Sequence, residues 1–493
     1  MLHQSDLLAI DLGAESGRAI LGEFDGNRLQ LEEVHRFLNT PVRLPDGQHW
    51  NVLRLLTEIK DSIGLVVRRQ GKQLASIGLD TWGVDFGLLD GKGALLTTPY
   101  HYRDNRTDGM LEEAFRRMPR EQIFELTGIQ FMPINSLYQL LSMVVNQAPV
   151  LEAAETFLMT PDLFNYWLTG EKVCEFSIAT TSQCYDPRQC AWSDPLLAGM
   201  SIPTRIFPQI IPPGTVVGPL LQIVAEETGA SAVPVIAPAC HDTGSAVAAV
   251  PAQRENFAWL SSGTWSVMGT ELPEPVINSS SLKFNFTNEG GVNSTFRFSK
   301  NIAGLWLVQE CRRTWAARGE EYSYDDLTKM AAEAAPFVAL VDPDYSEFAK
   351  PGDMPARLQA YCTRTGQPAP ESKGAIVRCA LESLALKYRL VLERLESMIG
   401  YRLEPLHIVG GGTKNRLLSQ FTADAIGRQV IAGPAEATAI GNILMQAFAL
   451  KLISSLAEGR QVVARSFALE TYEPRDPNQW DDVYQRFVGL MEQ

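Results

Sequence analysis

Two apolar runs joined by a turn of small residues occur once in each half of the chain. The first unit is LLAIDLGAESGRAILGEF, residues 7–24, and the second is FAWLSSGTWSVMGTE, residues 257–271. Apolar runs of this length that end at glycine and hydroxyl residues are typical of a strand, a turn and a second strand. The repetition indicates an internal repeat, and a boundary near Pro251 places one unit in each of two domains, residues 1–250 and 251–493.

The size and charge of the chain support two globular domains and argue against one class of partner. With 493 residues, the chain exceeds the size at which a single hydrophobic core stops growing. The net charge of −14, with no run of Lys or Arg, argues against a nucleic-acid partner, because a phosphate backbone requires a basic face. It does not exclude a nucleotide, whose few phosphates need only backbone N–H groups, a metal ion and one or two cations.

The cysteine pattern and the first residues predict a cytoplasmic protein. The seven cysteines lack a CxxC pair, which is typical of reduced thiols rather than of a disulfide framework. The first residues, MLHQSDLL, carry no basic segment, and the apolar run that follows is interrupted at Asp11. We therefore expect no signal peptide, no transmembrane helix and no membrane partner.

The rest of the chain alternates strand and helix patterns. Strand patterns follow at residues 27–37 and 74–90, helix patterns at about 52–69 and at 375–400, and strand, turn and helix patterns at 233–250 and 406–427. The first three strands are expected to form a meander. This order of elements predicts an α/β layer fold with a mixed sheet.

The turn in the first unit, DLGAESGR, has the features of a phosphate site. Small residues let backbone amides approach an anion closely, and the carboxylate of Asp11 at the end of a strand can hold the Mg²⁺ of that anion. The alternative is an ordinary Asp-x-Gly turn. The second turn, at residues 261–266, favours the phosphate interpretation, because two such loops facing each other could hold a triphosphate.

A glycine triplet, Gly410 to Gly412, separates a predicted strand from a predicted helix. Bare backbone at this place could contact a flat ring or a phosphate. The dinucleotide pattern GxGxxG fails because Asn415 replaces its third glycine, and the chain contains no GxxxxGK[ST]. A nicotinamide enzyme stays as an alternative, and it predicts that NAD binds and ATP does not.

The string CHDTGSA places His241 and Asp242 at the start of a helix, directly after an apolar strand. An aspartate in this position can take the proton of a hydroxyl that attacks a γ-phosphate, a contribution of roughly 10²–10⁴-fold in rate. The alternatives are that Asp242 is an ordinary helix N-cap and that His241 is a packing residue.

Two further strings, LDTWGVDF at residues 79–86 and YRDNRTD at residues 102–108, concentrate Trp, Asp and Arg. Such mixtures suit a polyol, which offers hydroxyls to carboxylates and a C–H face to an aromatic ring. For the second string a solvated turn with local ion pairs is an equal alternative. The sequence leaves open which of four residues contact the sugar: Asp80, Asp85, Asp104 and Arg106.

Several strings in one fixed order resemble the FGGY carbohydrate kinases, and most closely the branch that phosphorylates L-rhamnulose. They are DLGAESGR, GLDTWGVDF, YRDNR, CHDTGSAV, LSSGTWSVMG, KNIAGLWLVQE and HIVGGGTKN, and the match runs from Asp11 past Gly441. The resemblance implies an α/β fold of two ribonuclease-H-like domains, of the actin and hexokinase ATPase type, around a central cleft. It implies MgATP between the domains, with the sugar and the first phosphate loop in residues 1–250 and the main ATP site in residues 251–493.

The resemblance also implies roles for particular residues of this sequence. Asp242 would accept the proton of the sugar hydroxyl, and Asp11 would be the carboxylate on the magnesium side. Besides Asp242, the residues that would line the sugar site are Gly83, His241, Thr243 and Asn301. The residues that would contact ATP are Ala14, Glu15, Ser16, Gly17, Arg18, Thr264, Gln309 and Gly411.

Two departures from the wider family refine these expectations. Glu15 stands where a small or hydroxyl residue is usual, so we expect its backbone N–H to contact phosphate while its side chain faces solvent. The string NSLYQL, with Tyr138, lacks the lysine and tryptophan common in the family. This weakens the case for xylulose or glycerol and agrees with a 6-deoxyketose, whose methyl group needs an apolar wall.

The expected reaction is therefore transfer of the γ-phosphoryl group of ATP to O1 of L-rhamnulose, with ATP, Mg²⁺ and the ketose as the small-molecule partners. The alternatives are a kinase for another ketose or deoxysugar, such as L-fuculose, and a non-catalytic actin-like sugar sensor. The sequence leaves the oligomeric state, the sugar ring form, the metal preference and any regulation open.

Overall fold

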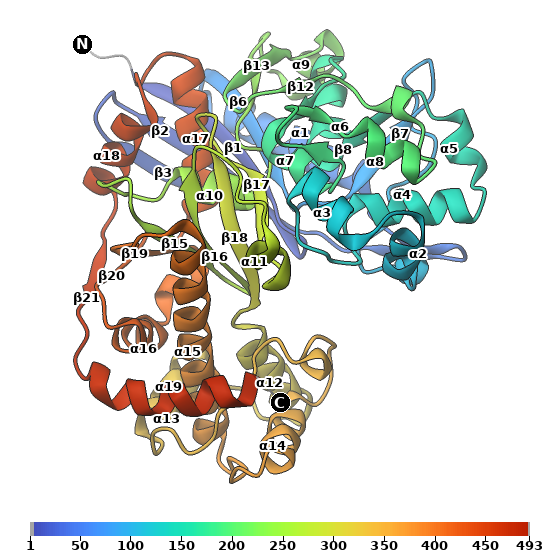
Figure 1. Cartoon of the computed structure of the whole chain (residues 1–493). Helices are drawn as coiled ribbons and strands as arrows, with labels where there is room; N and C mark the ends of the chain where they lie inside the picture. The colour runs from blue at the N-terminus through green and yellow to red at the C-terminus, as the bar shows by residue number, and fades with distance from the viewer. Residues whose placement is uncertain (1–3, 492–493) are drawn as a thin grey trace. The chain divides into compact units, whose positions relative to one another are not determined.

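The computed structural model describes residues 4–491, which form two compact units (Figure 1). Unit 1 comprises Met1–Gln253, Glu271–Phe298 and Ala437–Ser466, and unit 2 comprises Arg254–Thr270, Ser299–Glu436 and Phe467–Gln493. The predicted boundary between residues 250 and 251 stays a prediction, because the chain leaves unit 1 near this point but returns to it twice.

The sheet of unit 1 has the strand order β13-β14-β6-β1-β2-β3. Its strands are β1 (Ser5–Leu12), β2 (Ser16–Phe24), β3 (Leu29–Leu38), β6 (Leu74–Thr81), β13 (Thr215–Pro219) and β14 (Pro234–Ala237). β1, β2 and β3 form the predicted antiparallel meander, while β6 pairs parallel with β1, and β14 pairs parallel with β6. The sheet is therefore mixed, as predicted, and the central strand β1 is almost continuously buried, as expected for a strand covered on both faces.

One predicted strand, residues 74–90, is wrong. β6 ends at Thr81, and residues 86–89 form a separate strand, β7 (Phe86–Leu89), which pairs with β8 (Thr156–Met159) in another sheet. The interruption falls at Val84, whose φ is 69°. A residue in the left-handed region cannot continue an extended strand, so the chain turns here.

Helices cover the sheet of unit 1 and build its remaining layers. They are α1 (Val52–Gly64), α2 (Met110–Arg117), α3 (Arg120–Thr127), α4 (Ser136–Val145), α5 (Pro149–Ala153), α6 (Thr160–Thr169), α7 (Phe176–Thr181), α8 (Asp194–Gly199), α9 (Gln222–Thr228), α10 (Asp242–Ala248), α11 (Ser279–Lys283), α17 (Ala437–Ala449) and α18 (Leu456–Ser466). Residues 65–69 extend α1 as a π-helical turn, so the helix predicted at about 52–69 is confirmed. Short strand pairs occupy the loops: β4 (Val42–Leu44) with β5 (Gly47–His49), β9 (Cys174–Glu175) with β12 (Ile210–Ile211), and β10 (Tyr185–Asp186) with β11 (Ala191–Trp192).

The small-residue helix α10 packs closely against α17, which comes from the last quarter of the chain (Figure 1). At their crossing, a Cβ atom added to Gly441 of α17 would lie 1.7 Å from the carbonyl oxygen of Ser245 in α10. The helices therefore touch backbone to backbone, and only glycine fits at this position.

The second sheet has the order β17-β18-β16-β15-β19-β20-β21. Its strands are β15 (Ala258–Ser262), β16 (Trp265–Leu272), β17 (Thr287–Gly290), β18 (Phe296–Ala303), β19 (Leu406–Val409), β20 (Val430–Ala432) and β21 (Glu470–Tyr472). An antiparallel hairpin, β15 with β16, adjoins two parallel strands and an antiparallel edge strand. The first sheet has the same connectivity, so the internal repeat is confirmed at the level of the fold.

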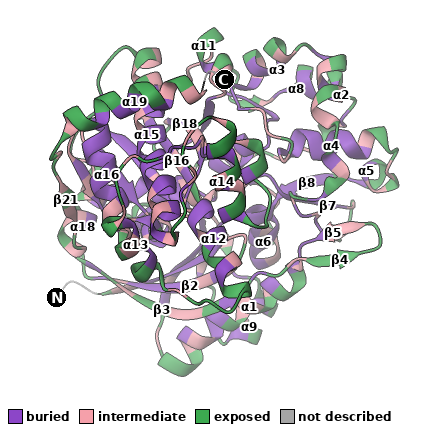
Figure 2. Ribbon diagram, turned by 90° about the horizontal axis from the view of Figure 1, so that it is seen from below, coloured by how far each residue is buried: buried purple, intermediate pink, exposed green. Residues whose placement is uncertain are grey.

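The helices of unit 2 are α12 (Trp306–Ala317), α13 (Tyr324–Glu333), α14 (Met354–Arg364), α15 (Lys373–Ile399), α16 (Arg416–Ile426) and α19 (Pro477–Met491). The long helix α15 was expected from its periodic apolar residues, and it ends at Gly400, whose φ of 83° suits only glycine well. α13, α16 and α19 pack against it, and Figure 2 shows the buried residues along α15 and α16. Within residues 4–491 no helix is both long and apolar enough to cross a membrane.

Candidate active site

The predicted residues of unit 1 gather where three neighbouring parallel strands end. Asp11 near the end of β1 lies opposite Asp80 in β6, and Thr81 at the end of β6 pairs with His241 just beyond β14. Backbone hydrogen bonds join these ends, since Thr81 N donates to Cys240 O at 2.9 Å. In α/β sheets the carboxyl ends of parallel strands are the usual place for a ligand.

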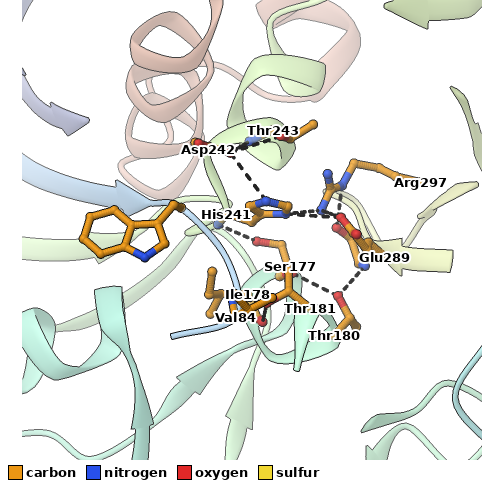
Figure 3. Close-up of polar contacts among 12 residues, drawn as sticks. Val84, Ser177, Ile178, Thr180, Thr181, His241, Asp242, Thr243, Glu289 and Arg297 are labelled. Atoms are coloured by element: carbon orange, nitrogen blue, oxygen red, sulfur yellow. Dashed lines mark hydrogen bonds and ion pairs between the residues drawn. The ribbon is translucent and has the colours of Figure 1, made fainter. Parts of the chain in front are cut away.

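Asp242 is the first residue of α10, and its carboxylate is held by its neighbour (Figure 3). Both the backbone N–H and the hydroxyl of Thr243 donate to Oδ1 of Asp242, at 2.5 and 3.0 Å. The N-cap residue of α10 is His241, so the interpretation of Asp242 as an ordinary N-cap is wrong. The side chain is 32% exposed, which leaves it accessible to a substrate.

The segment that carries His241 and Asp242 is fixed by α7. Glu175, immediately before α7, accepts hydrogen bonds from Cys240 N at 2.9 Å and from the Ser177 hydroxyl at 2.5 Å. The Ser177 oxygen in turn accepts the backbone N–H of His241 at 3.2 Å. Burial raises the pKa of Glu175. The loop between β14 and α10 is thus tied to a buried polar network rather than left free.

Gly83 lies in a strained turn next to the same helix. Val84 is a β-branched residue with positive φ, a conformation that costs energy and persists only where the surroundings impose it. Its N–H donates to Thr181 Oγ1 at 3.1 Å, and the Ser136 hydroxyl donates to its carbonyl at 2.5 Å. A Cβ atom at Gly83 would lie 3.2 Å from the Thr181 side chain, so this position has little room for a larger residue.

Asp85 serves the fold rather than a ligand. Its fully buried carboxylate accepts hydrogen bonds from the indoles of Trp50 and Trp82, at 2.5 and 2.9 Å, and from the Gln139 amide at 2.9 Å. Burial raises its pKa to about 6. These donors occupy both oxygens, and the string LDTWGVDF therefore builds a tryptophan-lined support under the turn.

Asp104 and Arg106, in YRDNR, also have structural partners. Asp104 precedes a 3-10 turn at Asn105–Thr107 and accepts the backbone N–H groups of Gln48 and Arg106, at 2.8 and 2.9 Å. The guanidinium of Arg106 lies 3.9 Å from the centre of the Tyr100 ring and donates to Gln139 at 2.5 Å. The solvated-turn alternative is wrong for these residues, because both are substantially buried and hold neighbouring segments together.

Asp80 and Asp11 form a carboxylate pair at the ends of β6 and β1. Asp80 is completely buried, accepts the Asn442 amide at 2.6 Å, and has one oxygen, Oδ1, without a hydrogen-bond partner among the described residues. Burial, followed by the charge of Asp11, raises the pKa of Asp80 well above its usual range. Asp11 pairs with Arg18, whose Nη2 lies 2.5 Å from Oδ2.

This pair fits the predicted magnesium site. Asp11 is near the carboxyl end of β1, with its side chain 7% exposed. Mg²⁺ commonly takes only one or two carboxylates from a protein, together with phosphate oxygens and water. Residues 4–491 contain no group of three or more His, Cys, Asp or Glu side chains that could hold a metal ion.

In the predicted phosphate turn the side chain of Glu15 is exposed, as expected, and Gly17 is buried. Glu15 is exposed, and its carbonyl accepts the backbone N–H of Asn39 at 3.0 Å. A Cβ atom at Gly17 would lie 2.3 Å from the Phe37 ring, so this glycine is needed for packing. Ala14 and Ser16, which complete the predicted turn, are partly exposed.

In unit 2 the predicted ATP residues Thr264 and Gln309 lie on two linked segments. Thr264 is in the turn between β15 and β16, and Gln309 is in the first turns of α12. The carbonyls of Gly263 and Thr264 accept the backbone N–H groups of Leu305 and Trp306, at 3.0 and 3.1 Å. The turn and the start of the helix are therefore held together.

The glycine triplet follows β19, which runs parallel to β15. A Cβ atom at Gly412 would lie 2.0 Å from the hydroxyl of Ser262, whereas nothing lies within 4 Å of one at Gly411. Gly412 is therefore a packing glycine, and Gly411 faces open space. Asn301 lies on β18 in unit 2, whereas the other predicted sugar residues belong to unit 1.

Two charged residues beside His241 were missed from the sequence. Glu289 on β17 and Arg297 on β18 form an ion pair of 3.2 Å, and both contact the His241 ring (Figure 3). Burial opposes the ionisation of Glu289, but the charge of Arg297 outweighs it and holds the pKa of Glu289 well below its ordinary value. The only signal in the sequence is an arginine between two phenylalanines, FRF, where a strand side chain is expected to be buried.

Comparison with known proteins identifies the class. Residues 7–249 match the N-terminal domain, and residues 258–450 the C-terminal domain, of the FGGY family of carbohydrate kinases. The chain belongs to this family and is a carbohydrate kinase. It is similar to a rhamnulokinase from Bacteroides thetaiotaomicron, 47% identical over 488 residues that cover 99% of this chain and 100% of the relative. It is also similar to a rhamnulokinase from Oceanobacillus iheyensis, 42% identical over 465 residues, covering 94% and 97%.

Solved structures share the whole fold at low identity. A gluconate kinase from Lactobacillus acidophilus has a TM-score of 0.82 and 16% identity, covering 99% of this chain and 98% of its own. A glycerol kinase from Plasmodium falciparum, solved with ADP, has a TM-score of 0.80 and 16% identity, covering 99% and 97%. The expected fold, two domains of the actin and hexokinase type, is confirmed.

Proposed function

We propose that this kinase transfers the γ-phosphoryl group of ATP to O1 of L-rhamnulose, a step in the catabolism of L-rhamnose. The substrate is supported by the rhamnulokinases to which the chain is similar over nearly its full length. The chemistry is supported above all by one observation, the partly exposed carboxylate of Asp242 at the carboxyl end of the sheet.

Asp242 acts as the general base. The contacts of its carboxylate with Thr243 and His241 fall on Oδ1, so Oδ2 is the oxygen that takes the proton of the sugar hydroxyl as it attacks phosphorus. The two donors of Thr243 keep the carboxylate in one orientation, which removes the need for reorganisation during the reaction. Gly83 and Asn301 complete the proposed contacts with the ketose.

The nucleotide is held by backbone-rich turns. The segment from Ala14 to Arg18 in unit 1, and Thr264, Gln309 and Gly411 in unit 2, supply the proposed contacts with ATP. Asp11 would hold the Mg²⁺, which when bound neutralises charge on the phosphates. The seven cysteines are free thiols, which agrees with the cytoplasm as the place of this reaction.

An ADP-release assay with MgATP tests the proposal, using L-rhamnulose, L-fuculose, L-ribulose, D-xylulose and glycerol on the wild type and on Asp242→Asn. We expect turnover of L-rhamnulose far above the others, and a loss of at least about a hundredfold in the variant. Asp194→Asn is the matched control, because Asp194 is also the first residue of a short helix, α8. Preference for another ketose would replace L-rhamnulose as the proposed substrate. No ATP turnover with any sugar would overturn phosphotransfer and favour the alternative of a non-catalytic sugar sensor.

A further inference from the structure

His241 is surrounded by charged groups on three elements (Figure 3). Its Nε2 lies 3.5 Å from Asp242 Oδ1 on α10, and its Nδ1 lies 3.3 Å from Glu289 Oε2 on β17. Nη2 of Arg297, on β18, forms a hydrogen bond with the same Nδ1 at 3.0 Å. The side chain of Arg297 is completely buried, and those of His241 and Glu289 are 14% and 10% exposed. A cluster so well shielded from water has strong internal electrostatic interactions.

The hydrogen bond from Arg297 decides which nitrogen of the ring carries the proton. A guanidinium group only donates, so Nδ1 of His241 must accept, and the proton of the neutral ring is on Nε2. That N–H faces Asp242. The distance of 3.5 Å is longer than a normal N–H···O bond, so the interaction with the carboxylate is chiefly electrostatic and leaves the N–H able to donate to a sugar hydroxyl.

Glu289 makes this arrangement possible. A completely buried guanidinium without a counter-charge is strongly unfavourable, and Glu289 supplies that charge at 3.2 Å. The Nε–H of Arg297 also donates to the carbonyl of Gly290 at 2.8 Å, which fixes the plane of the group against β17. β17 and β18, which both follow residue 250, therefore orient His241, a residue of the proposed sugar site.

We infer that Glu289 and Arg297 are positioning residues that hold His241 as a neutral Nε2–H donor toward the Asp242 carboxylate and the sugar hydroxyl. This inference rests on the proposed function for its catalytic consequence. The protonation state of the ring is a property of the protein alone and can be measured whether or not the substrate is correct.

The two positioning residues act on the ring in different ways. Among the described residues, the charged groups that face the His241 ring are Asp242, Glu289 and Arg297, and α7 contributes only the Ser177 hydroxyl, which contacts the backbone N–H. Removing Arg297 leaves Nδ1 without its donor, so an Nδ1–H can form and donate to Glu289, 3.3 Å away. Removing the Glu289 charge leaves Arg297 in place, so Nδ1 still accepts and the proton of the ring stays on Nε2.

The direct test is ¹⁵N NMR of the full chain labelled at its six histidines, with the His241 signals assigned by their loss in His241→Asn. In the wild type near neutral pH we expect a protonated Nε2 and an unprotonated Nδ1. At the same pH we expect Nδ1 to be protonated in Arg297→Met, because it can then donate to Glu289, and we expect the wild-type pattern in Glu289→Gln, because Arg297 is still present. A wild-type ring protonated on Nδ1 would overturn the inference, and this measurement does not require either the Arg297 or the Glu289 variant to fold.

Kinetics provide the second test, with Glu271→Gln as the matched control. Glu271 pairs with Arg460 in unit 1 and is also nearly buried, but that pair is not near His241 in any contact described. We expect Arg297→Met and Glu289→Gln to lower kcat/KM for the ketose about 10- to 100-fold with KM for ATP almost unchanged. Glu271→Gln, with a similar loss of thermal stability, should keep kcat/KM.

An equal loss of kcat/KM in the control would mean that the effect is only structural and would overturn the positioning role. Protonation of Nδ1 in Arg297→Met but not in Glu289→Gln would support it, because general loosening of the fold affects both variants in the same way. If the assay shows no ketose kinase activity while the wild-type tautomer is as expected, the proposed function fails and the inference about His241 stands.

Discussion

A methyl group added at Gly411 tests whether the nucleotide contacts the glycine loop. The added Cβ atom has nothing within 4 Å, so we expect Gly411→Ala to fold with almost unchanged Tm. If ATP lies against this backbone, the methyl group must displace it. Overpacking of a close contact costs about 1–3 kcal/mol, which corresponds to a rise of about 5- to 150-fold in KM for ATP. KM for the ketose should not change, and initial rates over a range of both substrates measure the two constants.

The neighbouring variant Gly412→Ala is the matched control. Its Cβ atom would lie 2.0 Å from the Ser262 hydroxyl, so the same methyl group should lower the stability of unit 2 by about 1–3 kcal/mol, measured as a lower Tm. The reasoning is refuted if Gly411→Ala leaves KM for ATP unchanged, because the nucleotide then does not lie on Gly411. It is also refuted if Gly411→Ala lowers the Tm as much as Gly412→Ala.

Three further predictions concern the interior and the metal. Gly441→Ala should destabilise unit 1 by at least about 2 kcal/mol, because its Cβ would lie 1.7 Å from Ser245 O, and a helix-propensity gain of about 1 kcal/mol does not offset this clash. As a control, Gly489→Ala on α19 has nothing within 4 Å of its Cβ and should raise the Tm slightly. Burial raises the pKa of Asp85 from 3.8 to about 6, so between these pH values the folded protein keeps a proton that the unfolded chain releases. The free energy of unfolding should therefore fall by up to about 3 kcal/mol as the pH rises from about 4 to about 6. Urea unfolding at several pH values should show this part of the slope in the wild type and not in Asp85→Asn. Asp11→Asn should lower kcat roughly a hundredfold and raise the Mg²⁺ concentration needed for half-maximal rate; an unchanged Mg²⁺ requirement would contradict the assigned role.

Much of the fold could be predicted from the sequence because its signals are local. The meander of β1 to β3, the hairpin of β15 and β16, and the end of α15 at Gly400 each follow from apolar runs and turn residues within a few positions. The repeat of one strand, turn, strand unit predicts one such unit in each half of the chain, and the structure places one in each sheet. Such patterns act over short distances, so the sequence alone contains them.

The failures have a common physical cause. The break between β6 and β7 is imposed on Val84 by Thr181 and Ser136, which are far away in sequence. The roles of Glu289 and Arg297 depend on a contact with His241 across about fifty positions, and neither residue belongs to a recognisable motif. Long-range contacts of this kind leave almost no periodicity in the sequence.

The division of unit 1 into three segments has a consequence for synthesis of the chain. The sheet of unit 1 is complete by β14, but α17 and α18, which pack against α10, β1 and β3, are the last parts of this unit to be made. At ordinary elongation rates, roughly 10 to 40 s pass on the ribosome between residues 253 and 466. During this interval one face of the first sheet lacks the helix α17 that later covers it. This face includes Asp80 and Ser76, whose side chains form hydrogen bonds with residues of α17 in the complete fold. A nascent chain stalled before residue 437 should therefore expose this face to chaperones, and release of α17 from the exit tunnel should close it.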